Sequence, residues 1–76
     1  MFERITFDQK IMGGRACIRG MRITVSLVVN LVANEMTTEE ILNEYPDLEA
    51  EDIRQALQYA ASLARDELYP LSEERL

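Results

Sequence analysis

The chain has 76 residues, of which 47% are hydrophobic and 29% charged, and its formal net charge is −6. This length suits one domain, and so small a domain is marginally stable because it buries only about 60% of its unfolded surface. One cysteine excludes an internal disulfide, and the lack of histidine excludes imidazole catalysis and the usual zinc ligand. No catalytic residue, metal site or cofactor is therefore predicted, and Cys17 is expected to be buried.

Charge is distributed unevenly along the chain. Residues 1–24 carry five basic and two acidic side chains, whereas residues 25–76 carry three basic and twelve acidic ones. The basic part can contact phosphate, and the acidic part can attract a basic protein or simply keep the surface soluble. The N-terminus lacks the apolar stretch of a signal peptide and no apolar run is long enough to span a bilayer, so a cytoplasmic protein without membrane contact is expected.

Residues 1–25 are predicted to form a small β arm. Residues 5–7 alternate apolar and polar side chains, and residues 17–18 and 21–25 flank Arg19 and Gly20, a pair suited to a tight turn with positive φ. An isolated hairpin is marginal in water, so the arm must lie on the helices or pair with another chain. Its basic residues are candidate DNA contacts: Lys10, Arg15, Arg19 and Arg22. The alternative is that these arginines pair with acidic residues of the same chain, and the sequence favours neither role over the other.

Residues 26–69 are predicted to form three helices, followed by a tail at 70–76. The first helix, from an N-cap at Ser26 to Asn34, is apolar nearly all round, which favours burial on two sides. The second begins with a capping box at residues 37–40 and is stopped by a proline at position 46. The third begins near Glu49 with an acidic first turn and is expected to end before Pro70.

The three helices have the spacing of a helix-turn-helix unit. In such a unit the acidic first turn of the third helix would face phosphates unfavourably. Its favourable base-reading side chains are Arg54, Gln55 and Gln58. A second apolar edge of that helix, together with the tail, supplies candidate partner-binding residues: Tyr59, Leu63, Arg65, Leu71, Arg75 and Leu76.

These segments, in this order, resemble a known family. The matching motifs are Ile5-Thr6-Phe7-Asp8, Gly14-Arg15-x-Cys17-Ile18-x-Gly20-x-Arg22-Ile23-x-Val25, Met36-Thr37-x-Glu39-Glu40-Ile41, Tyr45-Pro46-x-Leu48 and Glu51-Asp52-Ile53-Arg54-x-Ala56-Leu57-x-Tyr59-Ala60. Over about residues 4–66 the sequence is similar to domain-of-unknown-function family 433, a VapB-like antitoxin family. Ala16, Met21 and Glu35 replace the proline, threonine and glycine that are usual there.

The resemblance implies a mainly α, homeodomain-like three-helix bundle with a small N-terminal β arm. It also implies an antitoxin of a type II toxin-antitoxin system, which binds and inhibits a PIN-like ribonuclease toxin and is not an enzyme. The alternative is a helix-turn-helix transcriptional regulator that binds operator DNA of its own operon. A homodimer is expected as well, because helix 26–34 has more apolar surface than one small core can use.

Overall fold

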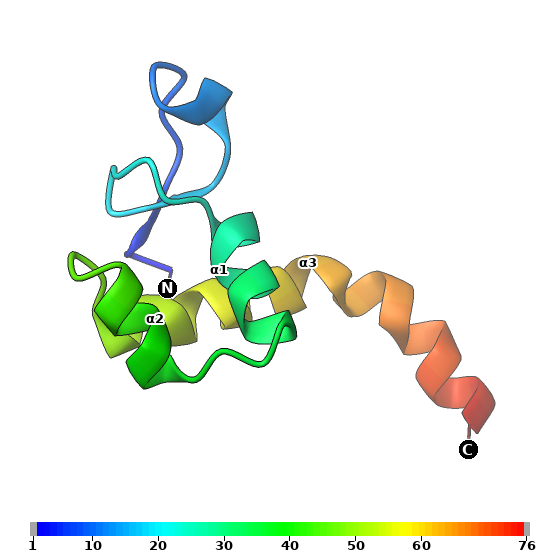
Figure 1. Cartoon of the computed structure of the whole chain (residues 1–76). Coiled ribbons are helices and arrows are strands. Elements are labelled where there is room, and N and C mark those ends of the chain that lie inside the picture. The colour runs from blue at the N-terminus through cyan, green and yellow to red at the C-terminus, as the bar shows by residue number, and fades with distance from the viewer. Residues whose placement is uncertain (1, 76) are drawn as a thin grey trace.

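The computed structural model describes the backbone of residues 2–75 and the side chains of residues 2–64. In chain order the elements are β1 (Ile5–Thr6), the 3-10 turn η1 (Met12–Gly14), β2 (Cys17–Ile18), α1 (Val25–Ala33), α2 (Thr38–Glu44) and α3 (Ala50–Arg75) (Figure 1). The described part of the chain is therefore a mainly helical domain with a small β arm, as predicted.

The arm is an antiparallel pair in which Ile5 lies opposite Ile18 in β2. The predicted tight turn follows β2 directly. Arg19 and Gly20 have φ values of 46° and 74°, and Met21 N donates to Ile18 O at 2.8 Å. Positive φ at both central residues is typical of a type I′ turn, whose twist matches that of the strands on either side.

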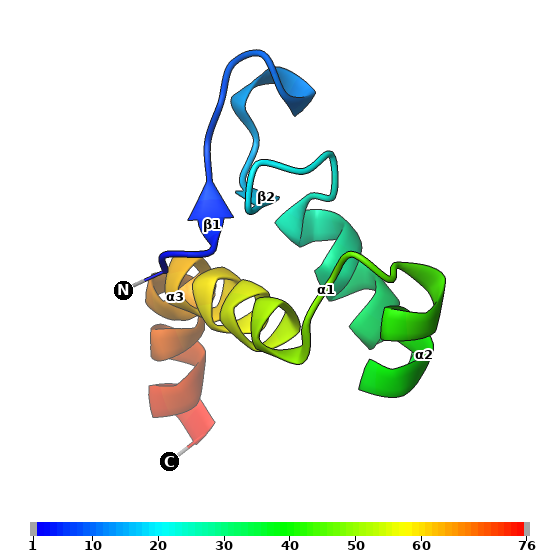
Figure 2. The same cartoon turned by 90° about the vertical axis from the view of Figure 1, so that its left-hand side faces the viewer.

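The segment between β1 and β2, residues 7–16, projects away from the helices in both views (Figures 1 and 2). Its conformation is maintained by its own contacts. Gly14 N donates to Ile11 O at 3.1 Å. A Cβ added at Gly14 would lie 2.9 Å from Gln9 Nε2, and its φ of 86° also favours glycine. The tip of the loop therefore has a defined shape of its own. The first and last residues of the segment meet the helical part, since Phe7 contacts Tyr59 and Ala16 packs against the core.

The N-cap of α1 is Thr24, two residues before the predicted Ser26. The Thr24 hydroxyl accepts a hydrogen bond from Leu27 N at 3.0 Å. Both residue types are good caps. Thr24 takes this role because its bridge with Cys17 keeps its backbone extended up to the start of the helix. The C-cap, Asn34, lies where the sequence predicted the end of the helix.

The capping box of α2 is confirmed. Thr37 Oγ1 accepts from Glu40 N at 3.1 Å, and Glu40 Oε1 accepts from Thr37 N at 2.8 Å. The last helix, α3, begins at Ala50 and extends past Pro70, at which the sequence predicted its end. A proline removes one backbone hydrogen bond from a helix, and a kinked helix can continue beyond it.

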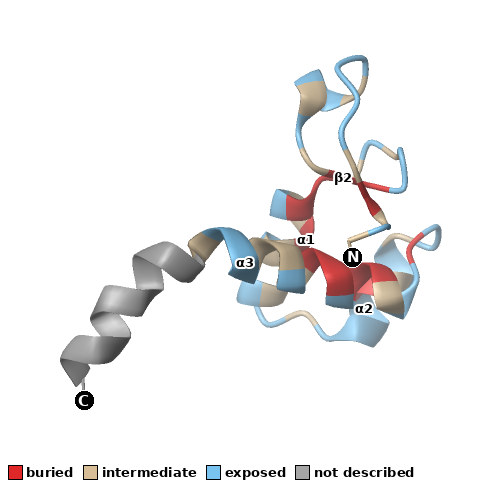
Figure 3. Cartoon of the chain, turned by 180° about the vertical axis from the view of Figure 1, so that it is seen from behind, coloured by how far each residue is buried: buried red, intermediate tan, exposed pale blue. Residues whose placement is uncertain are grey.

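The core lies where β2, α1, α2 and the first turns of α3 meet (Figure 3). Its fully covered members include Ile18, Val28, Ile41 and Ala56. Four other apolar residues of α1 are only half-buried: Leu27, Val29, Leu31 and Val32. Within one copy the arm and the other helices therefore leave part of this helix uncovered, and its covering by a second copy stays a prediction. None of the described helices has both the length and the apolar character needed to cross a membrane.

Candidate functional site

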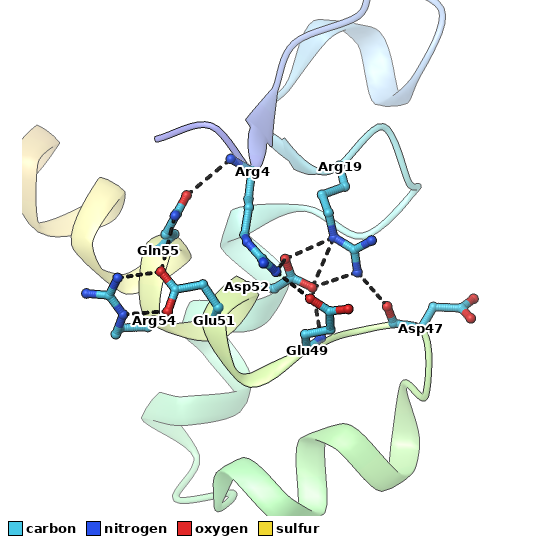
Figure 4. Close-up of polar contacts among 8 residues, drawn as sticks. All are labelled: Arg4, Arg19, Asp47, Glu49, Glu51, Asp52, Arg54 and Gln55. Carbon is cyan, nitrogen blue, oxygen red and sulfur yellow. Dashed lines mark hydrogen bonds and ion pairs between the residues drawn. The ribbon is translucent and has the colours of Figure 1, made fainter. Parts of the chain in front are cut away.

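A buried carboxylate joins the arm to the start of α3. Asp52, the third residue of this helix, has a fully buried side chain. Its Oδ1 accepts from Arg4 Nη1 at 2.9 Å and from Arg19 Nε at 3.0 Å, and its Oδ2 accepts from Arg19 Nη2 at 2.8 Å (Figure 4). Oδ2 also accepts from Glu49 N at 2.8 Å, which caps the helix. These four residues are named the Asp52 cluster.

The hairpin brings the two arginines to the same carboxylate. Arg4 directly precedes β1 and Arg19 directly follows β2, and Arg19 N donates to Arg4 O at 2.8 Å. Each has one further contact on the α3 side: Arg4 Nη1 with Glu49 Oε1 at 2.7 Å, and Arg19 Nη2 with the backbone oxygen of Asp47 at 2.8 Å. The helix-side end of the arm is therefore fixed by charged hydrogen bonds.

The Asp52 cluster is electrostatically satisfied. Burial raises the pKa of Asp52, but hydrogen bonds from Arg19, from Glu49 N and from Arg4 outweigh burial, so its pKa lies below the ordinary value of 3.8. Hydrogen bonds to Glu49 and Asp52 raise the pKa of Arg4. Within the described side chains, no buried nitrogen or oxygen lacks a hydrogen-bond partner. The cluster is thus a complete structural network.

Aromatic side chains meet further along α3. The centroid of the Tyr59 ring lies 5.6 Å from that of Phe2 and 6.0 Å from that of Phe7, both edge to face. Phe7 is 60% exposed, and Leu63, one turn beyond Tyr59 on the same helix face, is 64% exposed. Phe7, Tyr59 and Leu63 are named the Tyr59 patch.

Three of the seven candidate DNA-binding side chains are engaged within the chain. Arg19 belongs to the Asp52 cluster. Arg54 Nε donates to Glu51 Oε1 at 2.8 Å and its Nη2 contacts Oε2 of the same carboxylate; bonds from Arg54 and Gln55 lower the pKa of Glu51 to about 2. Gln55 is buried. The other four are exposed: Lys10, Arg15, Arg22 and Gln58. None of these three cations forms an ion pair within residues 2–64.

Of the candidate partner-binding residues, Tyr59 and Leu63 lie together in the patch. The side chains of Arg65, Leu71, Arg75 and Leu76 lie outside the described residues. Sequence reasoning missed the contribution of Phe7 to the patch and that of Asp52 to arm attachment. For Asp52 a signal was present, since an acidic third residue is typical of a helix start.

Cys17 is buried, as predicted. Among the described side chains, no group of three or more acidic or cysteine residues is arranged to hold a metal ion.

The fold and the cluster define a small helical domain whose β arm is joined to its last helix by ion pairs to a buried carboxylate. The chain belongs to the DUF433 family, described as protein of unknown function, which it matches over residues 5–60. The fold is similar to that of a DUF433 member protein from Anabaena variabilis ATCC 29413, with a TM-score of 0.72 and 30% identity, covering 88% of this chain and 65% of that crystallised chain.

The sequence is 40% identical over 58 residues to uncharacterized protein y4eO of Sinorhizobium fredii (strain NBRC 101917 / NGR234). That match covers 76% of this chain and 26% of the relative, so the chain spans about a quarter of the relative's length.

Proposed function

We propose that this chain is an antitoxin that binds and inhibits a PIN-like ribonuclease. The observation that carries the proposal is the Tyr59 patch. Phe7 and Leu63 are exposed beside the half-buried ring of Tyr59, where the residue that follows β1 meets α3. Large apolar side chains on rigid elements are typical anchors of protein interfaces, where a few such residues supply most of the affinity.

The charge of the helices supports a basic partner. Residues 25–64 carry eight acidic side chains and one basic one, Arg54, which is paired with Glu51. A ribonuclease must attract a polyanion, so a basic surface around its active site is expected. An acidic protein is steered toward such a surface and, once bound, excludes RNA from it.

The proposal is tested by co-expressing the chain with the nuclease encoded by the adjacent gene and measuring capture and RNA cleavage. Leu63→Gln and Phe7→Ser are each expected to weaken capture by about 30-fold or more, the effect of losing an interface anchor. Ala61→Gln is the matched control, because position 61 is exposed on another face of α3. Capture that is equal in all four proteins excludes the patch, and no capture by the wild type excludes the function.

A second candidate function, regulation of its own operon by DNA binding, is favoured by the exposed cations of the arm. In this proposal the three helices form a homeodomain-like helix-turn-helix unit, and Lys10, Arg15 and Arg22 contact phosphates. The first turn of α3 contributes little, because Arg54 is engaged with Glu51 and Gln55 is buried.

A gel-shift assay with the upstream DNA at two salt concentrations tests this second function. Replacing the three arm cations by serine should weaken binding and reduce the salt slope, by about 0.9 for each phosphate that is no longer neutralised. Arg54→Ser is the control with one fewer cation on α3 and should bind as the wild type does. If Arg54→Ser abolishes the shift and the arm variant does not, α3 is the DNA-contacting element. Absence of a shift at low salt removes DNA binding.

A further inference from the structure

We propose that Asp52 is a positioning residue that sets the register of the arm along α3 and thereby assembles the Tyr59 patch. The inference rests on the proposed function only for the use of that patch by a partner. In this proposal, a buried carboxylate at one end of the arm–helix contact determines where an exposed aromatic residue lies at the other end.

The contacts of the β1 segment follow one face of α3. The Arg4 side chain bonds to Asp52, and Arg4 N donates to Gln55 Oε1 at 3.1 Å. Further along, the Phe7 ring meets Tyr59. Positions 52, 55 and 59 are separated by three and four residues, the spacing of neighbours on a helix surface. Phe2 also meets the Tyr59 ring, because a turn in which Ile5 N donates to Phe2 O reverses the chain beside the helix. From Arg4 to Phe7 the arm therefore lies along the helix in one register, and a shift of this register separates Phe7 from Tyr59.

The Phe7 end and the Asp52 end of this contact differ in how strictly they fix the position of the arm on α3. Phe7 is 60% exposed, so little burial restrains its ring beside Tyr59, and aromatic pairs tolerate a range of offsets. The carboxylate of Asp52 receives two guanidinium groups, one of them through two nitrogens, in a geometry that fixes direction as well as distance. The buried end therefore specifies the position of the arm on α3 more strictly than the exposed end does.

The turn geometry depends on the same bonds. Arg19 has a φ of 46°, in the left-handed region that disfavours residues other than glycine and asparagine. Such a conformation persists where its surroundings determine it. Here the side chain of Arg19 is bonded to Asp52 and to the backbone oxygen of Asp47. Loss of these bonds therefore releases the end of β2, whereas Arg4 retains Glu49 as a partner.

A matched control lies directly after the same turn. Arg22 is exposed and forms no ion pair with the side chains of residues 2–64. Arg19→Asn and Arg22→Asn remove the same charge, and asparagine tolerates a left-handed backbone at position 19. The two variants therefore differ in whether the Asp52 cluster loses a member.

The experiment compares both variants with the wild type by NMR, through the nuclear Overhauser contact between the Phe7 and Tyr59 rings and through amide exchange. In Arg19→Asn the ring contact should disappear. The amides of residues 5–6 and 17–19 should exchange on the order of 10- to 100-fold faster, the effect of losing charged hydrogen bonds, with α1 and residues 50–60 unchanged. Arg22→Asn should match the wild type, and Arg19→Lys, which keeps the charge without the planar fork, should be intermediate.

Retention of the ring contact and of arm protection in Arg19→Asn overturns the proposal. If amide exchange accelerates equally in the arm and in the helices, the proposal is also overturned, because the cluster then contributes only to overall stability. Capture of the adjacent nuclease by Arg19→Asn should fall as much as capture by Leu63→Gln. Since the NMR measurement needs no partner, failure of the wild type to capture the nuclease rejects the proposed function and leaves the positioning result to be judged by NMR.

Discussion

The two ends of the arm place the same side chain in opposite environments. Near α3, Arg4 and Arg19 share the buried carboxylate of Asp52. In the projecting loop, Arg15 is exposed and forms no ion pair within residues 2–64, and Arg22, which follows the turn of Arg19, is likewise exposed and unpaired within those residues. All four precede α1 in a glycine-containing, basic stretch. Proximity to a buried carboxylate, and not the local sequence, therefore decides which arginine is structural.

The physical consequence is a large difference in what each arginine contributes. A fully buried carboxylate deprived of a partner leaves an uncompensated charge in a low-dielectric region, whereas an exposed cation remains solvated after any substitution nearby. Positive charge at the projecting end is therefore free for an external anion, and positive charge at the helix end is committed to the fold. Substitutions at the two ends should accordingly differ in their effects.

The largest effect is expected from removing the shared carboxylate. Asp52→Asn should lower the free energy of unfolding by about 2–3 kcal/mol, because Arg4 and Arg19 lose their charged hydrogen bonds to a common carboxylate and the cap of α3 is weakened. Arg15→Asn should change it by no more than about 0.5 kcal/mol. Urea denaturation followed by far-ultraviolet circular dichroism measures both. Similar losses in the two variants would show that the two ends of the arm do not differ as described.

Acid should weaken the helix end of the arm in the wild type. Asp52 has a pKa below 3.8, and Glu51 has a pKa of about 2. The unfolded chain therefore takes up protons at a pH where the folded chain does not. Stability from these carboxylates is complete above about pH 4.5 and is lost as the pH falls through their lowered pKa values. Denaturation midpoints between pH 5 and pH 2 should fall less steeply in Asp52→Asn than in the wild type; parallel curves would contradict the assignment.

Sequence reasoning predicted the features that depend on neighbouring residues. The turn at Arg19 and Gly20 and the capping box from Thr37 to Glu40 are both local, and both are present. The N-cap of α1 was placed two residues late, because the extended backbone of Thr24 depends on a bridge to Cys17 that the helix periodicity does not reveal.

The candidate site was less predictable, because its contacts join distant parts of the chain. The sequence left two roles open for Arg19, phosphate contact or pairing within the chain, and its partner Asp52 lies 33 residues away. Tyr59 and Leu63 were identified as a second apolar edge of the last helix. The contribution of Phe7 was not, because its contact with Tyr59 exists only once the arm lies along α3.

The smallest effect on stability is expected at two residues that share an unfavourable positive φ but differ in their side-chain contacts. Glu35, like Arg19, has a positive φ, 69°. It follows the C-cap of α1, where Glu35 N donates to Val32 O at 2.9 Å and Met36 N donates to Leu31 O at 3.1 Å, the Schellman pattern that favours glycine.

Glycine is therefore expected to have opposite effects at these two positions. Glu35→Gly relieves the left-handed strain without removing an ion pair made within residues 2–64, and should raise the free energy of unfolding by about 0.5–1 kcal/mol. For a domain of this size, that corresponds to a rise in Tm of roughly 2–8 °C. Arg19→Gly relieves the same strain but removes charged hydrogen bonds to the buried carboxylate of Asp52, and should lower the free energy of unfolding. Thermal denaturation of both variants decides the point: a gain at both positions would mean that backbone strain outweighs the ion pairs of the Asp52 cluster.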